Sequence, residues 1–179
     1  SLNNSRGENV FASPVNALSS MMRLCIAGQL ALMPASVAIL APGVNAFRRL
    51  RKNLTEPVFN SWGYNTRSAA LRIPCSDDGN RRIEYRLAGA DANPYLVAAT
   101  ILTGMLYGLE HIDEGDLPEP QHDQPELPLF QQEAIEAFAR CQYLTDSLGD
   151  AFSEQWVACK LSELDWFERI VTQEESHLA

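Results

Sequence analysis

Histidine, cysteine and long apolar runs are all scarce in this 179-residue sequence. The four cysteines are widely spaced, without a Cys-x-x-Cys pair or a histidine at ligand spacing, which argues against a zinc site. The longest apolar run, residues 95–109, is shorter than the ~20 residues that a membrane-spanning helix needs. The first residues show no signal-peptide pattern. We therefore expect a cytoplasmic protein with no membrane partner.

Basic residues are also few, and most of them are concentrated in one region. The net charge of −9 argues against nucleic acid as a partner, because phosphate backbones attract basic surfaces. Residues 48–86, however, hold nine of the fourteen Lys and Arg residues against four acidic ones, a local charge of +5, and the remainder carries −14. Eight of the nine are arginine, whose planar guanidinium suits phosphate and carboxylate. The region is either an anion-binding site or a solvated basic surface.

Apolar residues at helical spacing predict a largely helical single domain. Pro34 is expected to divide the first apolar segment into two helices, because proline lacks the N–H that an interior helical position donates. Asn93 and Pro94 suit the N-cap and first position of a helix that is apolar on nearly all sides, and is therefore expected to be buried. The predicted helices span residues 16–32, 34–40, 94–109, 130–138 and 152–175.

The basic region itself predicts a long loop followed by two strands. Residues 43–64 have no clear period and carry several Gly, Asn and Pro residues, as functional loops often do. Residues 68–73 and 82–87 flank a segment rich in turn-forming residues and predict an antiparallel pair. In the second strand, alternation places Arg82, Glu84 and Arg86 on one face. These three side chains form either a surface ion ladder or a carboxylate offered to a metal between two anion-binding arginines.

Three motifs in this region resemble the glutamine synthetase superfamily. Residues 65–74 (NTRSAALRIP) and 82–95 (RIEYRLAGADANPY) resemble its C-terminal signatures, and residues 42–49 (PGVNAFRR) resemble its Asn-Ser-Tyr-Lys-Arg segment. Residues 9–11 and 167–175 fit further segments, and Ser1-Leu2 resembles the end of the family's His-x-His-x-Ser-Leu motif. The resemblance therefore covers essentially the whole chain.

This resemblance implies an α/β (α+β) fold in which a curved antiparallel sheet is flanked by helices. It also implies that residues 1–179 are a C-terminal fragment of the catalytic domain, without the N-terminal β-grasp domain and the first half of the catalytic domain. Because the absent half supplies most metal-binding glutamates, we expect the fragment alone to be inactive. Family members form homo-oligomeric rings, which we expect of the full-length parent.

The resemblance also implies roles for individual residues. Arg49, Arg67 and Arg86 match positions that hold the substrate glutamate, and Arg49 and Arg67 are the expected catalytic residues. Arg67, Arg72 and Arg82 match positions that contact ATP phosphates. Glu84 matches a ligand of the divalent metal, Mg²⁺ or Mn²⁺. ATP and glutamate together bring about five to six negative charges into one cleft, which requires several arginines and hard divalent ions.

The implied reaction is the ATP-dependent ligation of an amine to the γ-carboxylate of glutamate, through γ-glutamyl phosphate. Glutamine synthetases carry a glutamate that binds ammonium at the position of Thr55, and Glu56 is one residue out of step. This departure, together with residues 62–64 and 88–95, favours a member similar to γ-glutamylpolyamine (putrescine) synthetases. Glutamine synthetase proper, using ammonia, remains an alternative. A non-catalytic homologue is a third, although it would be expected to lose Arg49, Arg72 or Glu84.

Overall fold

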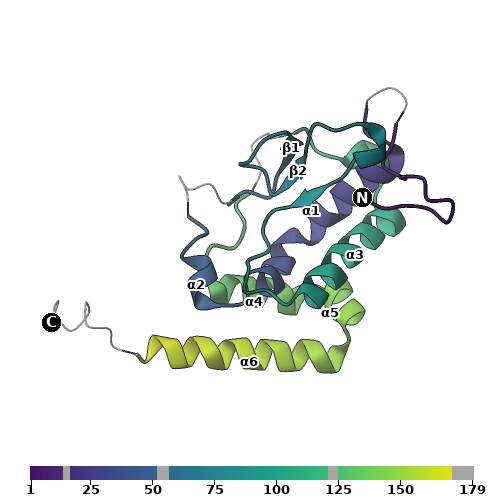
Figure 1. The fold of residues 1–179 in the computed structure, drawn as a ribbon. Helices are drawn as coiled ribbons and strands as arrows, with labels where there is room; N and C mark the ends of the chain where they lie inside the picture. The colour runs from purple at the N-terminus through teal and green to yellow at the C-terminus, as the bar shows by residue number, and fades with distance from the viewer. Residues whose placement is uncertain (14–16, 52–56, 121–124, 171–179) are drawn as a thin grey trace.

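The computed structural model describes residues 1–13, 17–51, 57–120 and 125–170, and its helices pack around one long central helix (Figure 1). The helices are α1 (Ser20–Leu40), α2 (Val44–Phe47), α3 (Pro94–His111), α4 (Gln131–Arg140), α5 (Gln142–Leu148) and α6 (Asp150–Glu168). The strands are β1 (Trp62–Tyr64), β2 (Leu71–Ile73) and β3 (Glu84–Tyr85), with short 3₁₀ turns at Asp78–Asn80 and Glu114–Asp116. The expected helix-rich α+β fold is confirmed.

The predicted break at Pro34 is wrong, because α1 is a single helix that runs through this proline. A proline at this position leaves the carbonyl of Leu30, four residues earlier, without its helical donor. In the structure the side-chain amide of Asn60 donates to that carbonyl at 2.9 Å. The surrounding core holds the rest of the turn, since Met33 and Val37 are almost completely buried. A distant side chain thus replaces the hydrogen bond that the sequence pattern predicted to be lost.

Helix α3 crosses α1 at very close range, and glycines make this approach possible. A Cβ atom built on Gly28 of α1 would lie 2.5 Å from the Cα atom of Gly108 in α3. One built on Gly108 would overlap the backbone carbonyl of Leu24. Helix α1 is long and apolar enough to cross a membrane by length and composition, but 78% of its most apolar window is buried inside the protein. It is the central core helix of this fold.

The expectation that α3 is buried on all sides is wrong. Thr100, Gly104 and Gly108 face α1 and are buried, but Leu102 and Leu106 on another face are 54% and 48% exposed. The N-terminus of the helix is as predicted: the Asn93 side chain accepts hydrogen bonds from two backbone amides of the first turn, and proline occupies the first position.

The sheet is small and mixed, with the order β1-β2-β3. Strands β2 and β3 form the predicted antiparallel pair, in which Arg72 lies opposite Glu84. Strand β1, which lies within the predicted loop, pairs with β2 in parallel. Asn65, which follows β1, has a φ of 50°, a left-handed conformation that asparagine tolerates better than most residues. Its N–H donates to the carbonyl of Ile73 in β2 at 2.8 Å and so extends the pairing of β1 with β2.

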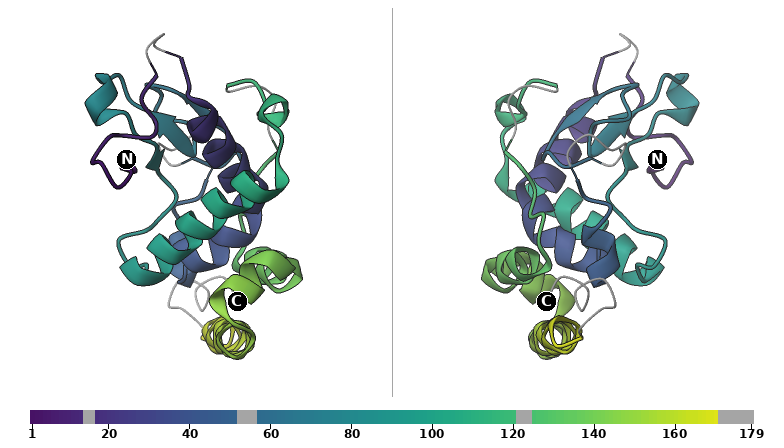
Figure 2. Two further views of the ribbon diagram at one scale, coloured as in Figure 1. Left: turned by 90° about the vertical axis from the view of Figure 1, so that its right-hand side faces the viewer. Right: turned by 90° about the vertical axis from the view of Figure 1, so that its left-hand side faces the viewer.

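The C-terminal helices lie on the opposite side of α1 from the sheet, and α6 runs along the outside of α4 and α5 (Figures 1 and 2). The predicted helices at 130–138 and 152–175 correspond to α4 and α6, while α5 and α2 were not predicted. Residues 171–175 lie outside the described residues. In α6, Ser153 and Lys160 are the buried positions, and Phe152, Trp156 and Val157 pack against the core while remaining partly exposed.

Candidate functional site

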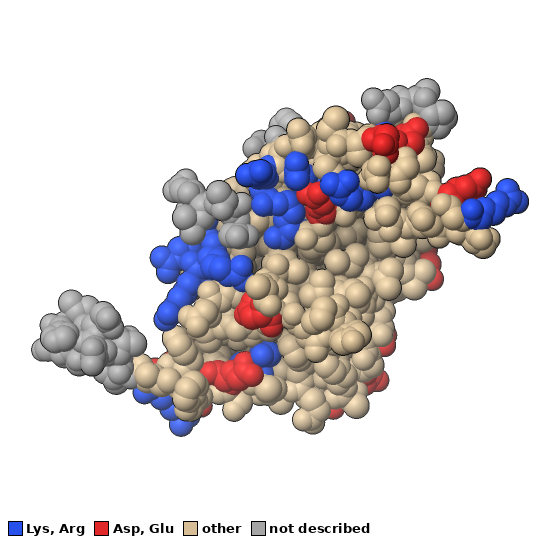
Figure 3. Space-filling view, in the orientation of Figure 1, with Lys and Arg blue, Asp and Glu red and all other residues tan. Residues whose placement is uncertain are grey.

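Arginine and lysine side chains gather on one face of the molecule, over the sheet and over α2, with a carboxylate among those over the sheet (Figure 3). The sheet carries Arg72 on β2 and Glu84 on β3, and Arg82 precedes β3. Strand pairing places Arg72 directly opposite Glu84, and alternation places Arg82 on the same face as Glu84. Three of the predicted site residues are therefore neighbours in the fold.

Glu84 is held between the two arginines, one at each carboxylate oxygen. Arg72 Nη1 donates to Glu84 Oε2 at 2.8 Å, and Arg82 Nη2 donates to Glu84 Oε1 at 3.1 Å. The three side chains are partly exposed, at 23% for Arg72, 31% for Glu84 and 42% for Arg82. Two positive charges and one negative charge leave a net positive group open to solvent, which suits an anionic ligand. We call this group the Arg–Glu–Arg cluster.

The charge state of Glu84 follows from this setting. Partial burial raises the pKa of Glu84, but the hydrogen bonds and positive charges of Arg72 and Arg82 lower it by more. The net effect holds the pKa of the Glu84 carboxyl below its ordinary value of 4.5. Glu84 is therefore a carboxylate at neutral pH, able to accept hydrogen bonds or to ligate a cation.

Further polar contacts fix the direction of each arginine. Arg72 Nη2 donates to the side-chain oxygen of Asn65 at 2.8 Å, so the turn after β1 also orients the guanidinium on β2. Arg82 Nη1 donates to the backbone carbonyl of Asn80 at 3.3 Å. Asn65 belongs to the motif at residues 65–74, but its spacing from Arg72 gave no signal of this contact.

Asn9 is a second residue that supports the site and to which the sequence motifs assigned no role. Its side-chain amide donates to the backbone carbonyls of Asp78 at 3.0 Å and of Arg81 at 2.8 Å, and lies 3.3 Å from that of Gly79. These contacts join the N-terminal segment to the turn that leads into β3, about seventy residues away along the chain. Asn9 therefore fixes the backbone immediately before Arg82.

Arg49 lies apart from the cluster and pairs with a different carboxylate. Its Nη2 atom is 3.6 Å from Asp91 Oδ1, and both side chains are about half exposed. A Cβ atom on Gly89 would approach Arg49 Nη2 to 2.5 Å, so glycine at this position leaves room for the guanidinium. The backbone N–H of Gly89 donates to the carbonyl of Leu40 at 2.9 Å, which ties this loop to the end of α1.

Arg67 and Arg86 have no ion-pair partner among the described residues. Arg67 is exposed in the segment between β1 and β2. Arg86 follows β3, and its Nη1 atom is buried without a hydrogen-bond partner in the described part of the chain. Buried guanidinium nitrogens are normally satisfied, so this atom is expected to acquire a partner from a ligand or another polypeptide. Strand alternation predicts that Arg86 lies on the same face of the sheet as Glu84, but no hydrogen bond or ion pair joins these two side chains in the structure.

The described residues do not by themselves form a metal site. No group of three or more Asp, Glu, His or Cys side chains within them could hold a metal ion. A hard divalent cation requires about six oxygen ligands, of which Glu84 can supply one or two. Thr55 and Glu56 lie outside the described residues. Their alignment with the ammonium-binding glutamate of glutamine synthetases was the basis for predicting the amine acceptor.

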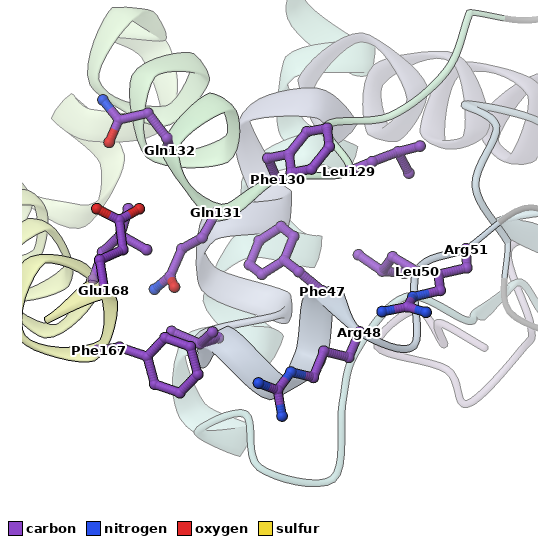
Figure 4. Close-up of a pocket in the computed structure, with 12 residues that line it drawn as sticks. Phe47, Arg48, Leu50, Arg51, Leu129, Phe130, Gln131, Gln132, Phe167 and Glu168 are labelled. Carbon is purple, nitrogen blue, oxygen red and sulfur yellow. The ribbon is translucent and has the colours of Figure 1, made fainter. Parts of the chain in front are cut away.

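A cavity of about 710 Å³ lies away from the Arg–Glu–Arg cluster, between α2, the start of α4 and the end of α6 (Figure 4). Phe47, Leu129 and Phe167 contribute apolar walls, and Arg48 lies over the Phe167 ring, 5.3 Å from its centroid. Arg48, Arg51 and Glu168 also line the cavity. In the described part of the chain these three form no ion pair with one another like those of Arg72, Arg82 and Glu84, so the cluster, with its fixed guanidinium groups, remains the better candidate for an anionic substrate.

Comparison with known proteins gives a consistent result. The family described as glutamine synthetase, catalytic domain, matches residues 1–178. Gamma-glutamylputrescine synthetase of Escherichia coli is 42% identical over 181 aligned residues, which cover 98% of this chain and 38% of that relative. Glutamine synthetase of Pyrococcus woesei is 32% identical over an alignment that covers 96% of this chain and 41% of that relative.

A solved structure titled "Apo GmaS without ligand" superposes with a TM-score of 0.84 at 26% sequence identity, covering 97% of this chain and 42% of that one. This chain thus spans about two fifths of the length of the proteins that it matches. The similarity extends over nearly all of its residues, including those of the Arg–Glu–Arg cluster.

Proposed function

Since this chain belongs to the glutamine synthetase catalytic-domain family, we propose that it is the C-terminal part of an ATP-dependent ligase that joins an amine to the γ-carboxylate of glutamate. The proposed full-length parent also contains an N-terminal β-grasp domain and the first half of the catalytic domain. The observation that carries this proposal is the Arg–Glu–Arg cluster, which presents two fixed guanidinium groups and one carboxylate on an open face of the sheet.

The proposed roles divide between the two substrates. Arg72 and Arg82 contact ATP phosphates, for which their fixed guanidinium groups provide several N–H donors. Arg67 contacts both the γ-phosphate and glutamate, and its exposed side chain is free to turn toward either. Arg49 and Arg86 bind the glutamate carboxylates. The buried and unpartnered Nη1 atom of Arg86 supports this role.

The proposed reaction has two steps. The γ-carboxylate of glutamate attacks the γ-phosphorus of ATP, the bond to the β-phosphate oxygen breaks, and γ-glutamyl phosphate and ADP form. The amine then attacks the γ-carbonyl carbon, inorganic phosphate leaves, and the amine nitrogen loses a proton. The arginines of this chain contribute by positioning the anionic groups and by balancing negative charge, which are the main sources of rate acceleration in phosphoryl transfer.

Members of the family generally use ATP and a divalent metal ion. We propose Mg²⁺ or Mn²⁺ here, with Glu84 supplying part of its ligand set and the remaining ligands coming from the absent half of the domain. The metal would balance phosphate charge beside the arginines. We further propose a cytoplasmic enzyme whose full-length parent assembles as a homo-oligomeric ring.

The acceptor is proposed to be a polyamine such as putrescine. The E. coli relative, 42% identical, is a gamma-glutamylputrescine synthetase, whereas the Pyrococcus glutamine synthetase is 32% identical. Thr55 at the position of the ammonium-binding glutamate also favours a larger amine. Glutamine synthetase proper remains the second candidate, since Glu56 lies beside Thr55 and could restore an ammonium site.

Phosphate release by the full-length parent with ATP, Mg²⁺ and glutamate tests this proposal. We expect release with putrescine and much less with ammonium, and Arg72→Lys should reduce it by more than tenfold because lysine cannot hold Glu84 and a phosphate in the same fork geometry. Arg140→Lys is the control, because Arg140 is 79% exposed on α4. Release with ammonium alone would identify a glutamine synthetase, and no release with any amine would refute the proposed activity.

A further inference from the structure

The cavity between α2, α4 and α6 has the size and the lining of a small-molecule site. Its volume of about 710 Å³ falls within the range of about 300–1,000 Å³ that is usual for ligand pockets. Such pockets combine apolar walls with a few polar side chains that orient the ligand. The apolar side chains that form most of this wall are those of Val44, Phe47, Leu50, Leu129, Leu164 and Phe167.

Gln131 is a polar residue in this lining, and it is almost completely buried. It is the first residue of α4, and its exposed fraction is 6%. Its Nε2 and Oε1 atoms are both buried, and neither has a hydrogen-bond partner in the described part of the chain. Figure 4 shows the amide directed into the space between Phe47 and Phe167. Because buried amides normally have partners, an occupant that accepts from Nε2 and donates to Oε1 would complete this side chain.

Two arginines give the same cavity positive charge. Arg48 and Arg51 line it, are exposed, and form no ion pair with the described residues. The Arg48 guanidinium lies 5.3 Å from the centroid of the Phe167 ring, a contact that holds it at the cavity without using its N–H donors. With Glu168, the charged lining residues of the described chain sum to one positive charge. The occupant is therefore expected to carry an anionic group.

We propose that this cavity binds a small N-acylated amino acid with an apolar side chain. The carboxylate of the ligand pairs with Arg48 and Arg51. Its amide C=O accepts from Gln131 Nε2, and its amide N–H donates to Gln131 Oε1. The apolar side chain packs against Phe47 and Leu129. The residues of the Arg–Glu–Arg cluster do not line this cavity, so the inference does not depend on the proposed ligase activity.

Related ligand classes match the lining less completely. A plain aliphatic or aromatic carboxylate has no N–H to donate to Gln131 Oε1. A free amino acid carries an ammonium group that Arg48 and Arg51 repel, and it lacks the amide. The carboxyl end of a peptide presents the same groups as an N-acylated amino acid, so the experiment has to separate these two sources.

An NMR titration of residues 1–179, which build their own buried core, tests the proposal with N-acetyl-L-phenylalanine. We expect a Kd of about 0.1–1 mM, in keeping with about fifteen non-hydrogen atoms, and a shift of the side-chain amide signals of Gln131. N-acetyl-L-phenylalanine amide lacks the charge and N-acetylglycine lacks the ring, and each should bind at least about fivefold more weakly. 3-Phenylpropionate lacks the amide and should bind at least about threefold more weakly.

Two variants separate the contributions of the polar side chains. Arg48→Gln should weaken the binding of N-acetyl-L-phenylalanine at least about threefold and leave that of its uncharged amide nearly unchanged. Gln131→Leu should abolish the preference for N-acetyl-L-phenylalanine over 3-phenylpropionate. It should not lower the unfolding temperature, because it replaces a buried amide that lacks partners among the described residues. Arg140→Gln is the control for Arg48→Gln, since Arg140 is 79% exposed on α4 and does not line the cavity.

Three results of the titration would overturn the proposal: no binding of N-acetyl-L-phenylalanine at about 10 mM, equal binding of its uncharged amide, or an undiminished preference in Gln131→Leu. A tetraglycyl-phenylalanine peptide that binds about tenfold more tightly would assign the cavity to the end of a polypeptide and overturn the small-molecule assignment. Gln131 signals that shift with protein concentration instead of ligand would identify a second copy of the chain as the occupant, which also contradicts the proposal.

Discussion

Replacing Asn9 tests whether a single side chain holds the turn that carries Arg82 into the site. The Asn9 amide donates to the carbonyls of Asp78 and Arg81 at 3.0 and 2.8 Å, and Arg81 is only 5% exposed. Asn9→Ala leaves both carbonyls without this donor. Asn9→Asp keeps the shape of the side chain but replaces the donor with a carboxylate oxygen, which repels the carbonyls.

The size of the effect follows from the number of bonds lost. The amide has two N–H groups, so two of its three carbonyl contacts can be strong at once. Asn9→Ala also removes the Oδ1 atom that accepts a hydrogen bond from the N–H of Phe11 at 3.1 Å, so three bonds are lost in all. At about 0.5–1.5 kcal/mol for each bond, Asn9→Ala should lower the free energy of unfolding by about 1.5–4.5 kcal/mol. For a chain of this length, each kcal/mol corresponds to a shift of about 2–4 °C in the unfolding temperature. Asn9→Asp should cost more than Asn9→Ala.

Urea unfolding of residues 1–179 measures this loss. Asn4→Ala is the control, because the contacts of Asn4 are exposed and confined to residues 4–8, and we expect its effect to be less than half as large. The pKa of Glu84, followed by NMR, should also rise toward its ordinary value in Asn9→Ala as Arg82 loses its fixed position. Equal stability of Asn9→Asp and the wild type would refute the reasoning, as would an unchanged pKa of Glu84.

Two further predictions concern packing and pH. Gly108→Ala should destabilise the chain by about 1–3 kcal/mol in urea unfolding, because the added Cβ overlaps the backbone of α1. Gly115→Ala is the control, since a Cβ at Gly115 meets nothing within 4 Å, and it should be nearly neutral. Equal stability of the two variants would contradict this prediction. Because the folded pKa of Glu84 lies below its ordinary value of 4.5, Glu84 stabilises the fold above that value, and the contribution is lost as the pH falls through the lower folded pKa. The stability difference between the wild type and Glu84→Gln should therefore be present at pH 7 and shrink below about pH 4.5; a pH-independent difference would exclude this linkage.

Much of the local structure could be predicted from the sequence. The Asn93-Pro94 pair marked the start of α3, and alternation over residues 82–87 marked β3 and the face that carries Arg82 and Glu84. These signals are local, since capping and alternation depend on neighbours within a few residues. The continuity of α1 could not be predicted in this way, because its carbonyl at Leu30 is satisfied by Asn60, thirty residues away.

The candidate site was predicted in part. The family motifs identified the arginines and Glu84, and the structure brings Arg72, Glu84 and Arg82 into direct contact. The ligand-binding roles proposed for Arg49, Arg67, Arg72, Arg82, Glu84 and Arg86 all stay predictions. The hydrogen bonds that Asn65 and Asn9 make to the site could not be predicted from the sequence. An asparagine among turn-forming residues predicts a turn, whatever its side chain contacts in the fold.

The sequence by itself determined the positions of the main helices, the β2–β3 pair and the family to which the chain belongs. Periodicity, capping residues and motifs depend only on the types and spacing of residues that are close together in the chain. Only the tertiary structure decided that Asn9 fastens the turn before Arg82, that glycines let α1 and α3 touch, and that Leu102 and Leu106 of α3 remain exposed. These features depend on distances between residues far apart in the chain, which only the packing of the whole core establishes.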